Sequence, residues 1–396
     1  MANTVLTPTA VTRKALQILH QKLNFVGNIN RQYDSSFAKD GAKIGSQLKI
    51  RLPNQYTVRT GASLSTQDTT ENSTTLSVAT QKGVDTTFTT NELTLSLDDF
   101  SDRILEPAMA VLAANIEADA LSMAKDVYQC VNNVGSAITL AKVLGGRKAL
   151  TDALAPSDKR KLILNTQDNL DLVDSLKGLF QDGSEIAKQY RDGMVGRTAG
   201  FGDIYENTLL ANQTTGTAAS ATTYTVNGAS QVGSGVIVAT GATTFKQGDI
   251  VTFAGCNRVH PESKADTGVL QQFVVTADYA GGAGTLAISP AIVTSGGTQN
   301  VAASPTNGGA VTKVGGASAI YKPSLAFHEN AFTFATADLE DVSQYGAWGA
   351  REVYDGISMR IARQYAISSD TVPCRIDVLY GFKTIRAELA CRILSN

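Results

Sequence analysis

The feature that constrains this chain most is a run of helix-spaced apolar residues. Within residues 97–134 they recur at steps of three and four: Leu105, Met109, Leu112, Ile116, Ala120, Met123 and Val127. This spacing places them on one helix face. Pro107 fits only a first helical turn, since deeper in a helix it removes a hydrogen bond. We therefore expect a helix that begins or bends near Glu106 and frays at 132–135. Such a rod of about 25 residues is roughly 40 Å long.

Length and composition limit the class of protein. At 396 residues the chain exceeds what one core usually supports, so we expect two or more domains. With 34 basic and 36 acidic residues, the net charge of −2 does not indicate a nucleic-acid binder. No signal peptide and no membrane-spanning run is visible. The four cysteines, widely spaced, are expected to be reduced thiols in a soluble protein: Cys130, Cys256, Cys374 and Cys391.

The first ninety residues predict an arm. Residues 8–23 have the pattern of a short amphipathic helix, and strand-like alternation follows at 43–52 and 76–90. Between these strands lie the thirteen residues 63–75, with eight Ser or Thr and Leu64 as the single large apolar side chain. A tip of this composition cannot bury itself on its own subunit. We expect a long β-arm that a neighbouring subunit covers.

The middle of the chain changes character twice. Residues 141–210 predict a mixed block, with helices at 142–155, 168–180 and 184–191, capped in the last two cases by Thr166 and Asp182, and strands at 160–165 and 203–210. Residues 211–319 are rich in Gly, Ser, Thr, Ala and Val. Short strands separated by glycine turns are expected there at 223–226, 235–239, 249–253, 272–276 and 285–289. This pattern predicts a small β-barrel inserted into a body of another kind.

The last segment, 320–396, returns to the body. We expect 325–337 to be half strand and half helix. Three alternating runs then follow at 357–361, 374–380 and 389–393. They predict a β-meander with one charged face and one apolar face that packs on the long helix.

No group of residues indicates chemistry. His20, His260 and His328 are isolated, and Cys256 with His260 lacks the further ligands of a zinc site. The segment Gly145-Gly146-Arg147-Lys148 lacks the spacing of a phosphate loop. Glu340-Asp341 is interpreted as a solvated turn, and Asp249 as a residue that opens a barrel strand. We assign no catalytic, cofactor-binding or metal-binding residue and expect no enzyme.

Four stretches together resemble the major coat proteins of short-tailed double-stranded DNA phages, the gene product 5 type. They are LAANIEADALSMA at 112–124, YRDGMVGRTAGFGDI at 190–204, FKQGDIVTFAG at 245–255 and PCRIDVLYGFKTIRAELACRI at 373–393. They resemble that family's spine helix, the segment before its insertion, a barrel strand and turn, and its closing strands. They occur in the family's order over most of the chain.

The resemblance implies an α+β Hong Kong 97-type capsid fold with an inserted all-β barrel domain. The domains would be an N-terminal arm at 1–42, an extended β-arm at 43–90, a peripheral domain with the spine helix at 91–140 and an axial domain at 141–210. The barrel at 211–319 and a return through the axial domain and closing sheet at 320–396 would complete the chain.

The implied function is that of a major capsid protein. Many copies, as pentamers and hexamers, would form an icosahedral shell around the phage genome, through a procapsid that expands on DNA packaging. The implied partners are a scaffolding protein, a portal protein and double-stranded DNA held without sequence-specific binding; no membrane and no cofactor are implied. The location would be the virion, after assembly in the host cytoplasm. The alternatives are the shell of a cellular nanocompartment or, less favoured, a β-rich tail or surface adhesin.

Overall fold

The computed structural model describes residues 8–31, 46–64, 66–67, 71–89, 106–176, 199–340, 342, 346, 348–354, 357–368 and 371–395. The chain forms two compact units. The first contains Met1–Ile50, Ser73–Leu121 and Phe332–Ile385, and the second contains Arg51–Asn72, Ser122–Ala331 and Arg386–Asn396. The helix expected at 184–191 and its Asp182 cap lie outside the described residues.

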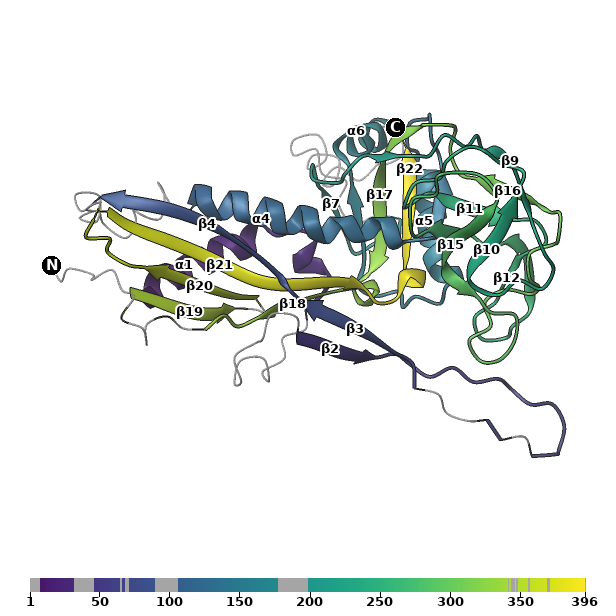
Figure 1. Ribbon diagram of the computed structural model, residues 1–396, viewed down its shortest axis with the longest axis horizontal. Coiled ribbons are helices and arrows are strands. Elements are labelled where there is room, and N and C mark those ends of the chain that lie inside the picture. Colours follow the sequence, from purple (N-terminus) through teal and green to yellow (C-terminus); the bar gives the residue numbers. More distant parts are fainter. Residues whose placement is uncertain are drawn as a thin grey trace. The chain divides into compact units, whose positions relative to one another are not determined.

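The first unit is built on a mostly antiparallel sheet. Its strand order is β1-β18-β21-β20-β19, and β4 also pairs with β21 (Figure 1). The bounds are β1 Asn30–Arg31, β4 Thr80–Thr89, β18 Phe332–Ala337, β19 Trp348–Tyr354, β20 Ile357–Arg363 and β21 Thr371–Thr384. Burial alternates in β21 from Val372 to Ile376, which is the period-two pattern that the sequence predicted. Beyond Ile376 the pattern fails, because Asp377 and Leu379 are buried as well.

Two helices complete this unit. Helix α1 (Pro8–Lys22) begins on a proline, which suits a first turn, and buries Val11, Ala15 and Leu19. Helix α4 (Glu106–Leu121) buries Met109, Leu112, Ile116 and Ala120 along one face, as expected. The carboxylate of Asp119 on α4 accepts a hydrogen bond from the Tyr380 hydroxyl at 2.5 Å and pairs with Lys82 Nζ at 2.7 Å, so it links α4 to β21 and β4.

The long helix is shorter than the spacing predicted. After 16 residues α4 gives way to the 3-10 helix η4 (Ser122–Asp126), and Cys130–Asn132 form strand β5. At roughly 1.5 Å per residue, α4 is about 24 Å long. The expectation of helix up to 132–135 is therefore wrong. Its cause is that Met123 and Val127 stay buried in η4 and just beyond it, so the apolar spacing continues where the α-helix does not.

The β-arm is also shorter at its base than expected. Strands β2 (Ser46–Arg51) and β3 (Ser73–Val78) form a two-stranded sheet, whereas β4, which follows after Ala79, pairs with β21. The alternating run at 76–90 is thus two strands, and only the first belongs to the arm. Leu76 and Val78 pack with Ala335, Ala337 and Leu379, which anchors β3 on the sheet of the first unit.

The second unit contains a mixed sheet of order β5-β22-β17-β6-β7, with β8 paired to β17. The bounds are β6 Arg160–Leu164, β7 Asp203–Glu206, β8 Gln213–Thr214, β17 Ile320–His328 and β22 Ala390–Ser395. Two expectations are corrected here. Residues 325–337 form β17, the 3-10 helix η5 (Glu329–Ala331) and β18, and β22 joins this sheet rather than a meander with β20 and β21.

Helices α5 (Leu140–Asp152) and α6 (Thr166–Leu176) accompany this sheet. The side chain of Asn165, not that of Thr166, caps α6: its Oδ1 accepts a hydrogen bond from the backbone N–H of Asp168 at 2.8 Å. Gly145 and Gly146 lie inside α5. A Cβ on Gly146 would lie 3.2 Å from Cδ1 of Ile393, so this glycine lets α5 approach β22 closely.

Six strands between residues 221 and 313 close into a barrel of order β10-β15-β14-β11-β16-β9 (Figure 1). The bounds are β9 Ala221–Val226, β10 Gly233–Ala239, β11 Ile250–Phe253, β14 Phe273–Val275, β15 Gly284–Ile292 and β16 Ala310–Lys313. The five barrel strands expected from the sequence are present with shifted ends, and β16 is additional. The barrel interior is filled by its own apolar cluster, which includes Tyr224, Val236, Phe253, Phe273 and Leu286.

A hairpin of β12 (Asn257–Val259) and β13 (Asp266–Leu270) extends from the barrel, and all five residues of β13 are exposed. This hairpin was not predicted from the sequence. Within the described ranges no helix is long and apolar enough to cross a membrane.

Candidate functional site

The residues weighed as metal ligands do not come together. Cys256 is fully buried, and burial raises the pKa of its thiol to about 12. His260 Nδ1 accepts hydrogen bonds from the backbone N–H groups of Glu262 and Ser263 at 3.3 and 3.2 Å, which closes a turn. Among the described residues, no three His, Cys, Asp or Glu side chains are grouped so that they could hold a metal.

The remaining single candidates have local structural contacts. His328 is buried, its Nδ1 accepts a hydrogen bond from the backbone N–H of Asn330 at 3.2 Å, and burial lowers its pKa. Lys148 pairs with Asp152 on α5 at 3.1 Å. The carbonyl oxygen of Glu340 accepts a hydrogen bond from Arg360 at 3.1 Å. Asp341 and the side chain of His20 lie outside the described residues.

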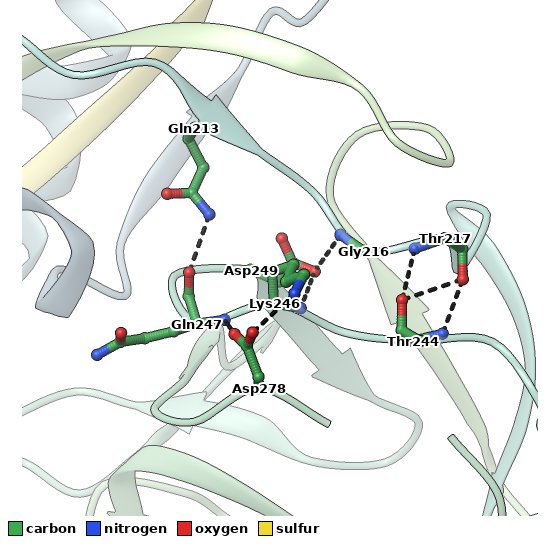
Figure 2. Close-up of polar contacts among 8 residues, drawn as sticks. All are labelled: Gln213, Gly216, Thr217, Thr244, Lys246, Gln247, Asp249 and Asp278. Atoms are coloured by element: carbon green, nitrogen blue, oxygen red, sulfur yellow. Dashed lines mark hydrogen bonds and ion pairs between the residues drawn. The ribbon is translucent and has the colours of Figure 1, made fainter. Parts of the chain in front are cut away.

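Asp249 lies at a buried joint at the start of β11. Its Oδ2 accepts hydrogen bonds from the backbone N–H groups of Gly216 and Lys246, each at 2.9 Å (Figure 2). Gly216 belongs to the chain that leads into the barrel, and Lys246 begins the turn before β11. Asp249 is fully buried, and its Oδ1 has no hydrogen-bond partner among the described residues. One carboxylate thus fixes the incoming chain to a barrel turn.

Two buried cations compensate this carboxylate. Lys313 Nζ donates to the carbonyl oxygens of Gly216 and Gly316 at 3.0 and 2.8 Å, and Arg392 Nη2 donates to that of Gly248 at 2.9 Å. Burial raises the pKa of Asp249, and the hydrogen bonds and the positive charges of Lys313 and Arg392 only partly oppose it. Burial also disfavours the charged form of Lys313, so it lowers the pKa of this lysine. A desolvated cluster of this kind favours one arrangement of the incoming chain on the barrel turn, and it adds less to the free energy of unfolding.

A second, exposed aspartate binds the same turn from the chain between β14 and β15. Asp278 accepts hydrogen bonds from Lys246 Nζ at 2.7 Å and from the backbone N–H of Gln247 at 2.9 Å (Figure 2). The hydrogen bond from Lys246 lowers the pKa of Asp278. Thr217 and Thr244 add a reciprocal clasp, because each hydroxyl oxygen accepts from the other residue's backbone N–H, at 2.9 and 3.1 Å.

The barrel is docked on the sheet of the second unit through further contacts. Ile250 of β11, Tyr321 of β17 and Leu394 of β22 form one buried cluster. Arg258 of β12 pairs with Asp152 of α5 at 3.0 Å. Gln272 of the barrel bonds to the backbone of Cys130 on the edge strand β5. Lys313, Arg392 and Gln272 were not predicted from the sequence. The alternation at 389–393 predicted a charged face for Arg392, although only 1% of this residue is exposed.

The arm presents apolar side chains to solvent. Beyond β2, Tyr56, Val58 and Leu64 are 56%, 93% and 83% exposed. The arm nevertheless has internal order. Oε1 of Gln67 accepts from the backbone N–H of Thr57 at 2.9 Å, and Nε2 of Gln67 donates to the carbonyl oxygen of Thr57 at 2.5 Å. These contacts supply what a strand neighbour would otherwise supply.

Comparison with known proteins places the chain in a family. The P22 coat protein family, gene protein 5, matches residues 9–393. No curated protein matches. Solved structures similar to this chain include one from Mycobacterium phage Che8, at 13% identity over 94% of this chain and 90% of that chain, with a TM-score of 0.48. Another is the bacteriophage PhiM1 mature capsid, at 11% identity over 94% and 87%, with a TM-score of 0.43. A third is a virus-like particle from Pyrococcus furiosus, at 8% identity over 97% and 98%, with a TM-score of 0.41.

The family match spans both units, the arm and the barrel in one collinear segment. It confirms the resemblance read from the sequence and the prediction of a phage major capsid protein. The chain belongs to the P22 coat protein family.

Proposed function

We propose that many copies of this capsid subunit assemble, as pentamers and hexamers, into a closed icosahedral shell held together through the arm. The observation that carries this proposal is the exposure of Tyr56, Val58 and Leu64 on the arm. Covering a Val or Leu side chain that is otherwise in water is worth roughly 1.5–3 kcal/mol. A neighbouring copy lying over the arm would gain this at every contact, and small gains add up over a shell.

The finer features of assembly follow from the family resemblance. A scaffolding protein would guide a procapsid in the host cytoplasm, a portal protein would occupy one vertex, and the shell would expand around packaged double-stranded DNA. A net charge of −2 suits a shell that encloses DNA without gripping it. The subunit would act by geometry and would catalyse no reaction.

In this proposal the unit that contains α4 and β21 forms the peripheral domain, the sheet around β17 and β22 forms the axial domain, and residues 211–319 are an inserted domain. The pairing of β8 with β17 supports the insertion. Thr214 lies opposite Ile320 and Gln213 opposite Tyr321, so the chain leaves and rejoins the sheet at the same place.

Replacing the arm by a tight turn tests the proposal. The backbone N–H of Leu52 already donates to the carbonyl oxygen of Asn72 at 2.8 Å, so an Asn-Gly turn between these residues is geometrically reasonable. We expect the shortened subunit to fold, with stability changed by under about 1 kcal/mol, but to assemble poorly. Thermal melts, light scattering and electron microscopy with the scaffolding protein present are the measurements. Normal shells from the shortened subunit would refute the role of the arm.

Two point variants separate folding from assembly. Val58→Asp changes a side chain that is 93% exposed, so it should leave the melting temperature unchanged and weaken assembly. Leu112→Asp places a charge at a position of α4 that is 2% exposed, so it should give insoluble protein. Equal solubility and equal assembly of the two variants would contradict the assignment of both surfaces.

A further inference from the structure

The arm contacts the barrel of its own chain at Gly297. A Cβ placed on Gly297 would lie 2.4 Å from the carbonyl oxygen of Gln55, 2.9 Å from its carbonyl carbon and 3.4 Å from the backbone nitrogen of Tyr56. Real Cβ atoms do not approach backbone atoms within 3.0 Å. Both segments belong to the second unit. The arm's backbone therefore rests directly on this barrel loop.

The glycine is explained by this contact and not by its own backbone. Gly296 has φ +83°, in the left-handed region that favours glycine, and nothing lies within 4 Å of its Cβ position. At Gly297 φ lies outside that region, so other residues could adopt the backbone conformation. The close approach of Gln55 is what excludes a side chain there.

The loop side of the contact is held in shape. Asn300 closes the loop from within, because its Oδ1 accepts from the backbone N–H of Val293 at 2.9 Å and its Nδ2 donates to the carbonyl oxygen of Ala291 at 2.7 Å. Lys264 Nζ adds a hydrogen bond to the carbonyl oxygen of Gln299 at 3.3 Å. On the arm side, Gln67 holds the backbone of Thr57, two residues beyond Gln55. Two braced segments therefore meet at Gly297.

We propose that the barrel loop 293–300 is a support loop that fixes the direction of the arm before a second copy of the chain binds it. The inference rests on the proposed role of the arm in assembly. A segment that is ordered in advance loses less conformational entropy when its partner covers it. The barrel thereby prepares Tyr56 and Val58, which follow the contact directly and are exposed.

Gly297→Ala in the full chain tests whether the support loop holds the arm, with Gly316→Ala as the matched control. Gly316 lies in the same unit, its φ is outside the left-handed region, and nothing is within 4 Å of its Cβ position. The measurements on free subunits are the rate of tryptic cleavage after Arg59 and deuterium uptake over residues 52–60. We expect Gly297→Ala to be cleaved at least threefold faster than the parent, and Gly316→Ala to match the parent. Equal cleavage in all three proteins would overturn the inference.

A second variant keeps the test decisive if Gly297→Ala also lowers the melting temperature. Asn300→Ala adds no atom near the arm and removes the two side-chain hydrogen bonds of Asn300 within the loop, so it should raise cleavage after Arg59 as well. If Asn300→Ala were cleaved at the same rate as the parent, the proposed role of the support loop would be refuted. These readouts on free subunits do not depend on shells. The turn variant that lacks the arm tests the proposed function separately, since shells formed without an arm would refute that function while leaving the contact at Gly297 intact.

Discussion

Gln272 completes the hydrogen bonding of Cys130 at the edge of the sheet in the second unit. Its Oε1 lies 2.8 Å from the backbone nitrogen of Cys130, and its Nε2 lies 3.2 Å from the carbonyl oxygen of the same residue. Cys130 is on β5, the end strand of the order β5-β22-β17-β6-β7. One amide side chain from the barrel thus takes the place of a further strand and covers an edge that would otherwise be open to another chain.

Gln272→Leu should therefore destabilise the protein. It leaves the N–H and the carbonyl oxygen of Cys130 without partners in a half-buried place, which costs about 1–3 kcal/mol. Urea unfolding followed by fluorescence measures this. Gln167→Leu is the control, because Gln167 is exposed and bonds to the side chain of Asp171 alone among the described residues. A change of similar size in both variants would show that the edge contact has no special weight.

Asp249 and Asp278 should affect the pH dependence of stability in opposite directions. Burial raises the pKa of Asp249 above its ordinary 3.8, so the folded state holds this proton more tightly than the unfolded state. Its contribution to stability is present at low pH and falls as pH rises from 3.8 through the raised pKa. The hydrogen bond from Lys246 lowers the pKa of Asp278, whose contribution is present above 3.8 and is lost as pH falls through the lowered pKa.

Thermal melts of Asp249→Asn and Asp278→Asn between about pH 3 and 7 check these signs. The melting temperature of the parent minus that of Asp249→Asn should decrease as pH rises above 3.8, and the corresponding difference for Asp278→Asn should increase. Parallel curves for the two variants would mean that burial does not determine the pKa of Asp249.

The segment 211–319 should fold alone as a barrel. Its core is its own, with Tyr224, Phe253, Phe273 and Leu286 fully buried inside it. The isolated segment loses Arg392 and the contact of Ile250 with Tyr321 and Leu394, so it should melt below the full chain. Circular dichroism and amide proton dispersion are the measurements. A random-coil spectrum, or one with substantial helix, would contradict an autonomous barrel.

The cysteines should be inert in the folded protein. All four are free, and burial raises the pKa of Cys130 and Cys256 to about 12 and that of Cys374 to about 11. Burial also raises the pKa of Cys391. Since the thiolate is the reactive form, these raised pKa values leave very little reactive thiolate at any of the four cysteines at pH 8. Dithiodipyridine should react with none in buffer and with all four in urea. Rapid reaction of the folded protein would indicate local opening around a thiol.

Elements with a clear apolar period were predictable from the sequence. Apolar spacing predicted helix α1 and strands β20 and β21, and short apolar runs between glycine turns predicted five barrel strands. The burial of β20 and β21 is less regular than the spacing, because each strand also contains a run of consecutive buried residues. Strands β12 and β13 were missed because they are short and β13 buries no residue. The end of α4 was missed because Met123 and Val127 continue its apolar spacing, and strand β5 was missed because its partner β22 lies at the other end of the chain. Spacing carries no information about such distant partners.

The polar joint was harder to foresee than the fold. Asp249 was correctly placed at the opening of a barrel strand, but its burial against Lys313 and Arg392 was not predicted. Arg392 alternates with Cys391 and Ile393, and alternation in an antiparallel strand normally indicates one wet face. In β22 all six residues are buried, and Arg392 reaches the carbonyl oxygen of Gly248 in the barrel turn. Only tertiary packing decides that this face is covered.

The pairing of β8 with β17 has a consequence for engineering. Since Thr214 lies opposite Ile320, the chain segments that enter and leave the barrel pair with each other beside the sheet of the second unit. They are as close together as the two ends of a short loop. A foreign domain whose own termini lie close together could be grafted between them without stretching the sheet. Any such replacement would have to supply an amide for Cys130 and a carbonyl oxygen for Arg392, because the native barrel provides both through Gln272 and Gly248. A display platform built on this coat protein therefore has to satisfy these two hydrogen-bonding sites as well as join the two chain ends.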